Sequence, residues 1–107
     1  MRAASSIEIV IFDSGSDPKQ AALGARKLAK DDDVLAIIGP FSSGEAAVAF
    51  AVAEREKLVM MSNASSAPGL TDGKEWAWRI SVDEGEQFAC VFGAVGWMVV
   101  GRASGEI

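Results

Sequence analysis

Two short loops rich in hydroxyl side chains are the parts of this sequence whose residue types could do chemistry. The first, FSSG (41–44), follows the apolar run VLAII and precedes a run with helical spacing; the second, NASSA (63–67), follows LVMM. In the first loop, Ser42 and Glu45 fit a capping box, which makes Ser42 the N-cap and Ser43 the first helical residue with a free N–H. Such a joint presents a hydroxyl, backbone donors and the positive end of a helix dipole, which together bind anions such as carboxylates.

The second loop offers complementary groups. Ser65 and Ser66 stand just before Pro68, and their hydroxyls and amides could serve the same anion. The carbonyls of Asn63 or Ala64 could accept from an ammonium group. Side by side, the two loops would meet the needs of an amino acid. Serine is also common in strand-to-helix loops simply because it caps helices, so the pattern alone leaves a purely structural role open.

The loops are positioned by alternating elements. Strands are expected at four places, and helices begin at Asp17-Pro18, after FSSG and near Ser81; the strand candidates are 7–13, 34–40, 58–63 and 76–81. Strands that alternate with helices indicate an α/β fold whose parallel sheet is covered on both sides. In such sheets, ligands bind beyond the carboxyl ends of the strands, where both serine loops would lie.

Each expected helix carries an apolar stripe that we expect to be buried. Ser81 with Glu84 reads as a further capping box at the start of the third helix. The end of the chain, after this helix begins, could continue as helix or form a short strand. The stripes are Ala21, Ala25 and Leu28; Ala46, Ala49, Phe50 and Ala53; and Phe88, Val91, Phe92 and Val95.

Composition excludes several classes of protein. The chain has 107 residues, half of them hydrophobic, which suffices for one small domain, and its net charge of −5 argues against nucleic acid as a partner. With one cysteine, Cys90, and no histidine, it can build neither an intrachain disulfide, nor a Cys/His zinc site, nor a histidine-based nucleophile. The run 31–33, DDD, reads as a solvated turn rather than a metal site. We therefore expect no metal and no cofactor.

An enzyme is a weaker alternative. It would have to use Ser43 or Ser66 with Lys74 or Asp83, and the sequence contains no P-loop and no GxGxxG motif in support. No apolar run reaches the roughly 20 residues that span a bilayer. The opening MRAASS lacks the apolar centre of a signal peptide.

The motifs GPFSSGEA (39–46) and SNASSAPGLTD (62–72), at this separation, resemble a known family. Residues 7–89 are similar to the amino-terminal lobe of type I periplasmic binding proteins, and most similar to the branched-chain amino-acid (Leu/Ile/Val) receptors of ABC importers. The resemblance implies a Rossmann-like, three-layer α/β lobe that closes on its ligand with a second lobe. This chain would be one partial lobe, 1–107, with an atypical tail at 90–107, lacking the usual first strand and the second lobe.

The resemblance also implies roles for individual residues. Ser43 would hold the ligand's α-carboxylate, the Ala64 carbonyl would meet the α-ammonium, Ser66 would bind both, and Phe41 would flank the ligand side chain. Together with the bottom-up assignment, the candidate ligand-binding residues are Phe41, Ser42, Ser43, Ala64, Ser65 and Ser66.

Further expectations follow from the resemblance. The partner of such a receptor is a membrane permease of an ABC importer, and its location is periplasmic or extracellular. Because the family places a strand between those equivalent to 7–13 and 34–40, we expect a homodimer or strand-swapped assembly, or else the tail 95–103 filling the gap. One lobe alone should bind leucine at millimolar concentration or not detectably. The alternative function is a sensor or dimerisation module derived from such a lobe.

Overall fold

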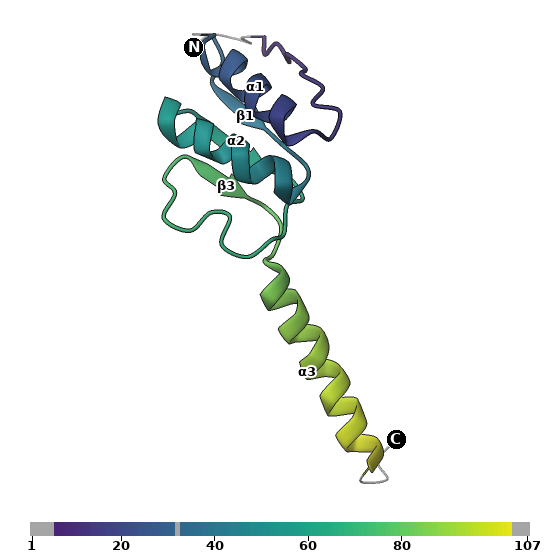
Figure 1. Cartoon of the computed structure of the whole chain (residues 1–107). Helices are drawn as coiled ribbons and strands as arrows, with labels where there is room; N and C mark the ends of the chain where they lie inside the picture. The colour runs from purple at the N-terminus through teal and green to yellow at the C-terminus, as the bar shows by residue number, and fades with distance from the viewer. Residues whose placement is uncertain (1–5, 32, 104–107) are drawn as a thin grey trace.

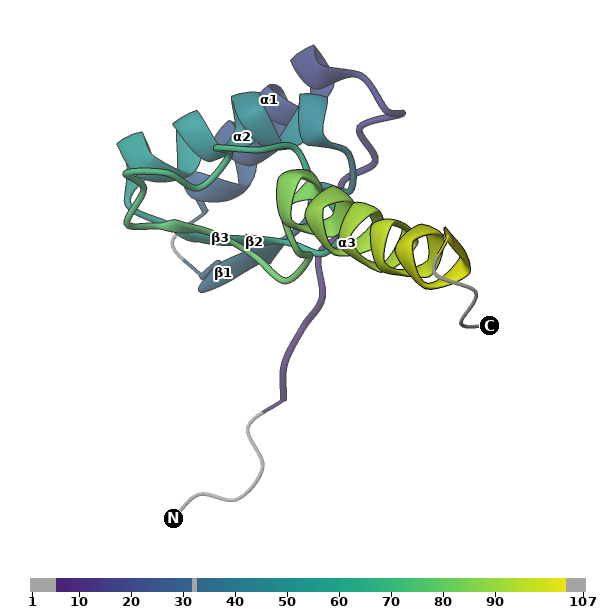
Figure 2. The ribbon, with the colours of Figure 1, turned by 90° about the horizontal axis from the view of Figure 1, so that it is seen from below.

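The chain forms three strands and three helices in the computed structural model, which describes residues 6–31 and 33–103, and side chains as far as residue 94. The elements are α1 (Pro18–Ala29), β1 (Ala36–Ile38), α2 (Ser43–Glu56), β2 (Val59–Ser62), β3 (Ala77–Arg79) and α3 (Glu84–Ala103). Figure 1 labels all of them except β2, which is labelled in Figure 2.

The strands make one parallel sheet in the order β1-β2-β3, with Ala36 opposite Val59 and Met60 opposite Ala77. The expected α/β fold with a parallel sheet is therefore confirmed. One feature differs: α1 and α2 lie over the same face of the sheet, and α3 runs away from it (Figure 2). Among the described elements, no helix covers the opposite face.

The core lies between the sheet and α2. Successive strand residues point to opposite faces, so Met60 and Ala77 face the helices and are almost fully buried. The stripe expected on α2 is confirmed, since each of its members is no more than 2 % exposed. These members are Ala46, Ala49, Phe50 and Ala53.

Helix α1 begins as the sequence predicts. Asp17 is the N-cap, and its carboxylate accepts from the Lys19 N–H at 3.0 Å, while Pro18 takes the first helical position, where no amide hydrogen is needed. Ala21 and Ala25 are buried as expected, whereas Leu28, the third member of the expected stripe, is only half-buried; α1 and α2 pack closely against each other.

The strand expected at 7–13 does not form. Within the part of the chain that the structure describes, this segment pairs with no strand, and its isoleucines are open to solvent: Ile7, Ile9 and Ile11 are 89, 81 and 86 % exposed. The β-branched sequence favours an extended chain, but a strand also needs a neighbour to accept its backbone hydrogen bonds. The segment is held at one end, where the Phe12 ring packs against Gly24 of α1, in space that a Cβ would occupy.

The prediction for the third helix is right in kind and wrong in detail. Ser81 is not its cap; the Asp83 carboxylate instead accepts from the Gly85 N–H at 2.6 Å. The helix continues through 95–103, so this tail does not fill a gap in the sheet. The stripe expected to be buried is exposed because α3 projects away from the sheet; Phe88, Val91 and Phe92 are 56, 55 and 68 % exposed, and the Val95 side chain lies outside the described residues.

Candidate ligand-binding site

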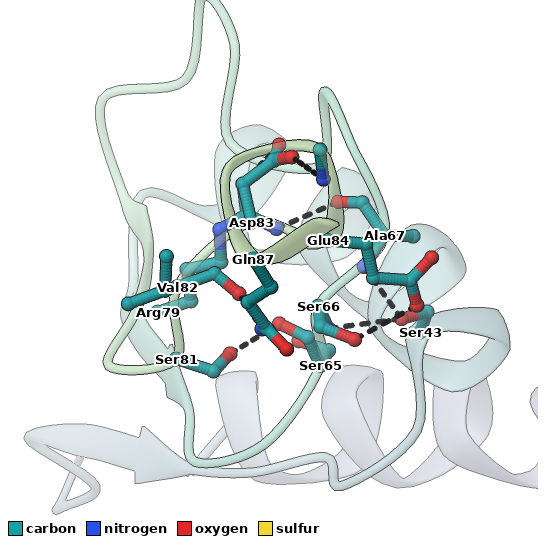
Figure 3. Close-up of polar contacts among 11 residues, drawn as sticks. Ser43, Ser65, Ser66, Ala67, Arg79, Ser81, Val82, Asp83, Glu84 and Gln87 are labelled. Carbon is teal, nitrogen blue, oxygen red and sulfur yellow. Dashed lines mark hydrogen bonds and ion pairs between the residues drawn. The ribbon is translucent and has the colours of Figure 1, made fainter. Parts of the chain in front are cut away.

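The two serine loops meet at the carboxyl-end edge of the sheet. Ser43 is the first residue of α2, and its Oγ accepts from the N–H groups of Ser66 and Ala67 at 3.2 and 3.1 Å. One hydroxyl therefore ties the loop after β2 to the start of the helix after β1 (Figure 3). The sequence placed both serines at the same edge, and the structure brings them into direct contact.

The capping box at the start of α2 forms as predicted. Ser42 Oγ accepts from the Glu45 N–H at 3.3 Å and donates to the Glu45 carboxylate at 2.8 Å. A partner that the sequence did not indicate is Ser14, whose hydroxyl donates to the other carboxylate oxygen of Glu45. Glu45 is 4 % exposed, and these hydrogen bonds, from Ser14 first and Ser42 second, hold its pKa below the ordinary value.

Helix α3 reaches the same place through its first residue. The Ser66 hydroxyl donates to Glu84 Oε1 at 2.9 Å, and the Glu84 N–H donates to the Ser66 carbonyl at 2.8 Å (Figure 3). A carboxylate thus stands beside the two serines. Sequence reasoning did not assign Glu84 to the site, because its only local signal was the capping pattern with Ser81.

Ser65 serves a different purpose from Ser66. It is 1 % exposed, its hydroxyl donates to Ser62 Oγ at 2.5 Å, and the Ser62 hydroxyl in turn donates to the Pro40 carbonyl at 2.7 Å. The Ser65 carbonyl accepts from the Ser81 hydroxyl. This buried chain of hydroxyls joins the ends of β1, β2 and β3 and so fixes the loop that carries Ser66.

The other two candidates lie at the surface. Phe41 is 70 % exposed in the loop between β1 and α2, and Ala64 is half-buried just after β2. A cavity of about 1190 Å³ runs between the 6–16 segment and β1 and includes Phe41 and Asn63 at one end, but neither Ser43 nor Ser66 lines it. Ser43 and Ser66 are both half-buried and lie outside this cavity.

Other kinds of site find little support. Among the described residues, no three metal-ligating side chains come together; Asp32 of the 31–33 run lies outside them. In the same part of the chain, no helix has both the length and the apolar character to cross a membrane.

Solved structures of similar proteins are amino-acid receptors. An ABC transporter substrate-binding protein from Desulfitobacterium hafniense, in complex with Leu, matches with a TM-score of 0.75 and 27 % identity, over 83 % of this chain and 28 % of its own. The leucine binding protein LivK from Thermotoga maritima matches with a TM-score of 0.75 and 29 % identity, over 83 % of this chain and 27 % of its own.

LivJ from Streptococcus pneumoniae, a branched-chain amino acid transporter substrate binding protein in complex with isoleucine, matches with a TM-score of 0.68 and 29 % identity, over 71 % of this chain and 22 % of its own. This chain therefore spans between 22 and 28 % of the length of these proteins. No curated protein matches its sequence.

The family comparison covers almost the whole chain. The sequence model described as "Periplasmic binding protein" matches residues 5–104. The solved structures similar to this chain are substrate-binding proteins rather than enzymes. The chain belongs to the periplasmic binding protein family.

Proposed function

We propose that this chain is the amino-acid-binding lobe of an ABC importer receptor, with the two serine loops as its ligand site. The observation that carries the proposal is the contact between Ser43 and the backbone of Ser66 and Ala67. It holds together two loops whose groups suit the two charged ends of an amino acid.

The hydrogen-bond pattern gives each hydroxyl a direction. A serine hydroxyl has one proton to donate and two lone pairs to accept with. Ser43 Oγ already accepts twice, so its proton remains for a ligand oxygen. The Ser43 and Gly44 N–H groups, first in α2, have no acceptor within the helix and point along the positive end of its dipole. This end of the site suits a carboxylate.

The other end suits an ammonium group. Ser66 donates its proton to Glu84, which leaves its oxygen to accept from a ligand N–H. The negative charge of Glu84 favours a cation here, and the carbonyl of Ala64, two residues before Ser66, is the proposed second acceptor. Phe41, exposed at the rim, offers an apolar surface for the ligand side chain. Ser42 and Ser65 support the site by fixing the two loops.

The proposed ligand class, partner and location are inferred from the similar proteins. Two of the similar structures are complexes with Leu and with isoleucine, so a branched-chain amino acid is the proposed ligand. The proposed partner of the whole protein is the membrane permease of an ABC importer, and the proposed location is periplasmic or extracellular. Because the chain spans 28 % of the length of its leucine-bound relative and so offers only part of a two-lobed site, we expect millimolar affinity or weaker.

Ligand-induced stabilisation tests the proposal. A ligand at ten times its Kd adds about 1.4 kcal/mol to folding stability, which raises the Tm of a chain of this size by roughly 6–11 °C. Leucine at tens of millimolar should raise Tm, whereas 4-methylpentanoate and 3-methylbutylamine, which each lack one charged end, should raise it less. Equal effects of all three, or none, would contradict the proposal.

We further propose that the chain associates with a second copy, as a homodimer or strand-swapped assembly. Strand β1 is at the edge of the sheet, and the exposed segment 7–13 near it pairs with no strand among residues 6–31 and 33–103. Light scattering should give twice the mass of one chain at micromolar concentration, and amides in 7–13 should gain hydrogen-exchange protection as concentration rises. A monomer at these concentrations refutes the association.

The same features favour the alternative function, a sensor or dimerisation module. The free edge of β1 and the exposed stripe on α3 would serve such a module without any ligand. The two functions separate cleanly: the module predicts a dimer whose Tm no amino acid changes, and the receptor predicts the leucine effect described above.

A further inference from the structure

The loop after β2 is held by two separate sets of contacts, one to its N–H groups and one to its carbonyls. The N–H groups of Ser66 and Ala67 donate to Ser43 Oγ. The three successive carbonyls of 65–67 all accept from the segment 79–84, which runs from the last residue of β3 to the first residue of α3. The loop that carries the proposed ligand groups is therefore held by 79–84 as well as by Ser43 (Figure 3).

The donors that 79–84 offers to these three carbonyls differ in charge. The first two carbonyls accept from the Ser81 hydroxyl and the Glu84 N–H, which are neutral groups. The third, the carbonyl of Ala67, accepts from Arg79 Nη1 at 2.6 Å. A hydrogen bond from an ionised donor is about twice as strong as one between neutral groups. Among these contacts, that of Arg79 should therefore contribute most to fixing the loop.

Arg79 is itself firmly placed. It is the last residue of β3 and lies opposite Ser62 of β2. Its side chain is 12 % exposed, and charged side chains are rarely buried to this degree without a partner of opposite charge. Asp83 is that partner: its Oδ2 accepts from Arg79 Nη2 at 3.1 Å, while its Oδ1 accepts from the Gly85 N–H in the first turn of α3. The two nitrogens of the guanidinium therefore join the ligand loop to the start of α3.

We propose that Arg79 is a positioning residue of the ligand site, which holds Ala67 against Ser43 and so directs the Ser43 hydroxyl proton at the ligand carboxylate. The inference rests on the proposed function and adds a residue that acts through Ser43. While two N–H groups occupy the lone pairs of this hydroxyl, its proton must point away from them. When Ala67 moves away, one lone pair is freed and the hydroxyl can rotate. Ligand binding must then fix the hydroxyl, at a cost in affinity.

Arg79→Lys tests the contact without any ligand, because it keeps the charge and removes the geometry. A guanidinium donates from two nitrogens in fixed directions, whereas an ammonium is a point charge on a flexible stem. The variant should speed hydrogen exchange of the Ala67 amide about fivefold, as loss of a hydrogen bond of ordinary strength would. Exchange of the Met60 amide, which is bonded within the sheet, should stay unchanged. Arg55→Lys, at an exposed position of α2, is the matched control and should change neither amide.

Three ligands test whether this contact serves the carboxylate end of the site. Arg79→Lys should lower the affinities for leucine and for 4-methylpentanoate about fivefold, because both would present a carboxylate to Ser43. The affinity for 3-methylbutylamine should be nearly unchanged, because Ser66 keeps both of its hydrogen bonds to Glu84. Amide shifts in NMR titrations give all three affinities. Equal losses for the three ligands, or no loss for leucine, would overturn the positioning role.

The outcomes separate this inference from the proposed function. If circular dichroism shows that Arg79→Lys does not fold, Asp83→Asn takes its place; it removes the charge that fixes Arg79, keeps an oxygen for the Gly85 N–H and should change the same readouts in the same direction. Unchanged exchange of the Ala67 amide in a folded variant would overturn the inference and leave the proposed function intact. A wild-type chain in which leucine shifts no amide at 42–44 or 64–67 would overturn the proposed function, and with it the role of Arg79 in binding.

Discussion

Ser43 and Ser66 come from two different loops, yet the Ser66 N–H donates to Ser43 Oγ at 3.2 Å. This contact uses the lone pairs of the Ser43 hydroxyl to fix the loop that carries Ser66 and leaves the hydroxyl proton available for a further hydrogen bond. It joins the start of α2 to the loop after β2, the two places where the sheet edge can present donors and acceptors together.

Removing the Ser43 hydroxyl should weaken both the loop contact and ligand binding. A hydrogen bond to a charged group is worth about 1.5–3 kcal/mol, so Ser43→Ala should lower leucine affinity about ten- to a hundredfold. Ser43→Thr, which keeps a hydroxyl, should retain most of the binding. The check is the Tm rise at a fixed leucine concentration, and an unchanged rise in the alanine variant would remove Ser43 from the site.

The charge of Glu84 should matter for ligands that carry an ammonium group. Glu84→Gln keeps a side-chain oxygen for the Ser66 hydroxyl but removes the negative charge, which at a partly exposed site should cost ~1 kcal/mol, or about fivefold in leucine affinity. Binding of 4-methylpentanoate should be unchanged or tighter. Glu86→Gln is the control for net charge, and if it weakens leucine binding equally, the effect is not local to Ser66.

Glu45 should contribute a pH-dependent part of the stability. Its pKa is lowered in the folded chain by hydrogen bonds from Ser14 and Ser42, while the unfolded value is about 4.3. The contribution is therefore fully present above that pH and is lost as pH falls through the lower, folded pKa. Glu45→Gln should therefore make the free energy of unfolding depend less on pH in the acid range, and urea unfolding at several pH values measures this dependence. If the free energy of unfolding of the variant falls with pH as steeply as that of the wild type, Glu45 does not contribute the pH-dependent stability.

The stability of the small core should depend heavily on Phe50, which is fully buried on the inner side of α2. Phe50→Ala should cost about 3–5 kcal/mol, much of the stability available to a domain of this size. Val48→Ala, on the outer side of the same helix, should change stability by less than ~1 kcal/mol. Urea unfolding followed by circular dichroism measures both, and a Phe50→Ala chain as stable as wild type would place the core elsewhere.

The sequence predicted what local chemistry determines. Asp17-Pro18 and Ser42 with Glu45 specify the starts of two helices within a few residues, and the stripe around Phe50 specifies the buried side of α2. The meeting of Ser43 and Ser66 also followed, because parallel strands end at the same edge of a sheet.

The structural features that the sequence did not predict depend on contacts between residues that are far apart in the chain. The run 7–13 has every local mark of a strand, yet pairing depends on a neighbour, and none lies beside it in the described chain. The stripe at Phe88 predicted a helix correctly, but its burial depended on the direction in which α3 leaves the sheet. The hydrogen bond from Ser14 to Glu45 joins residues 31 positions apart, and no local sequence pattern predicts it.

The most direct measurement of the central claim is a leucine titration of the ¹⁵N-labelled chain, followed by the amide shifts of its backbone. Binding through the two serine loops predicts saturable shifts at 42–44 and 64–67, with a millimolar Kd, that disappear in Ser43→Ala. Shifts confined to other parts of the chain, or none at leucine concentrations near its solubility limit, would contradict the assignment of an amino-acid site to Ser43 and Ser66.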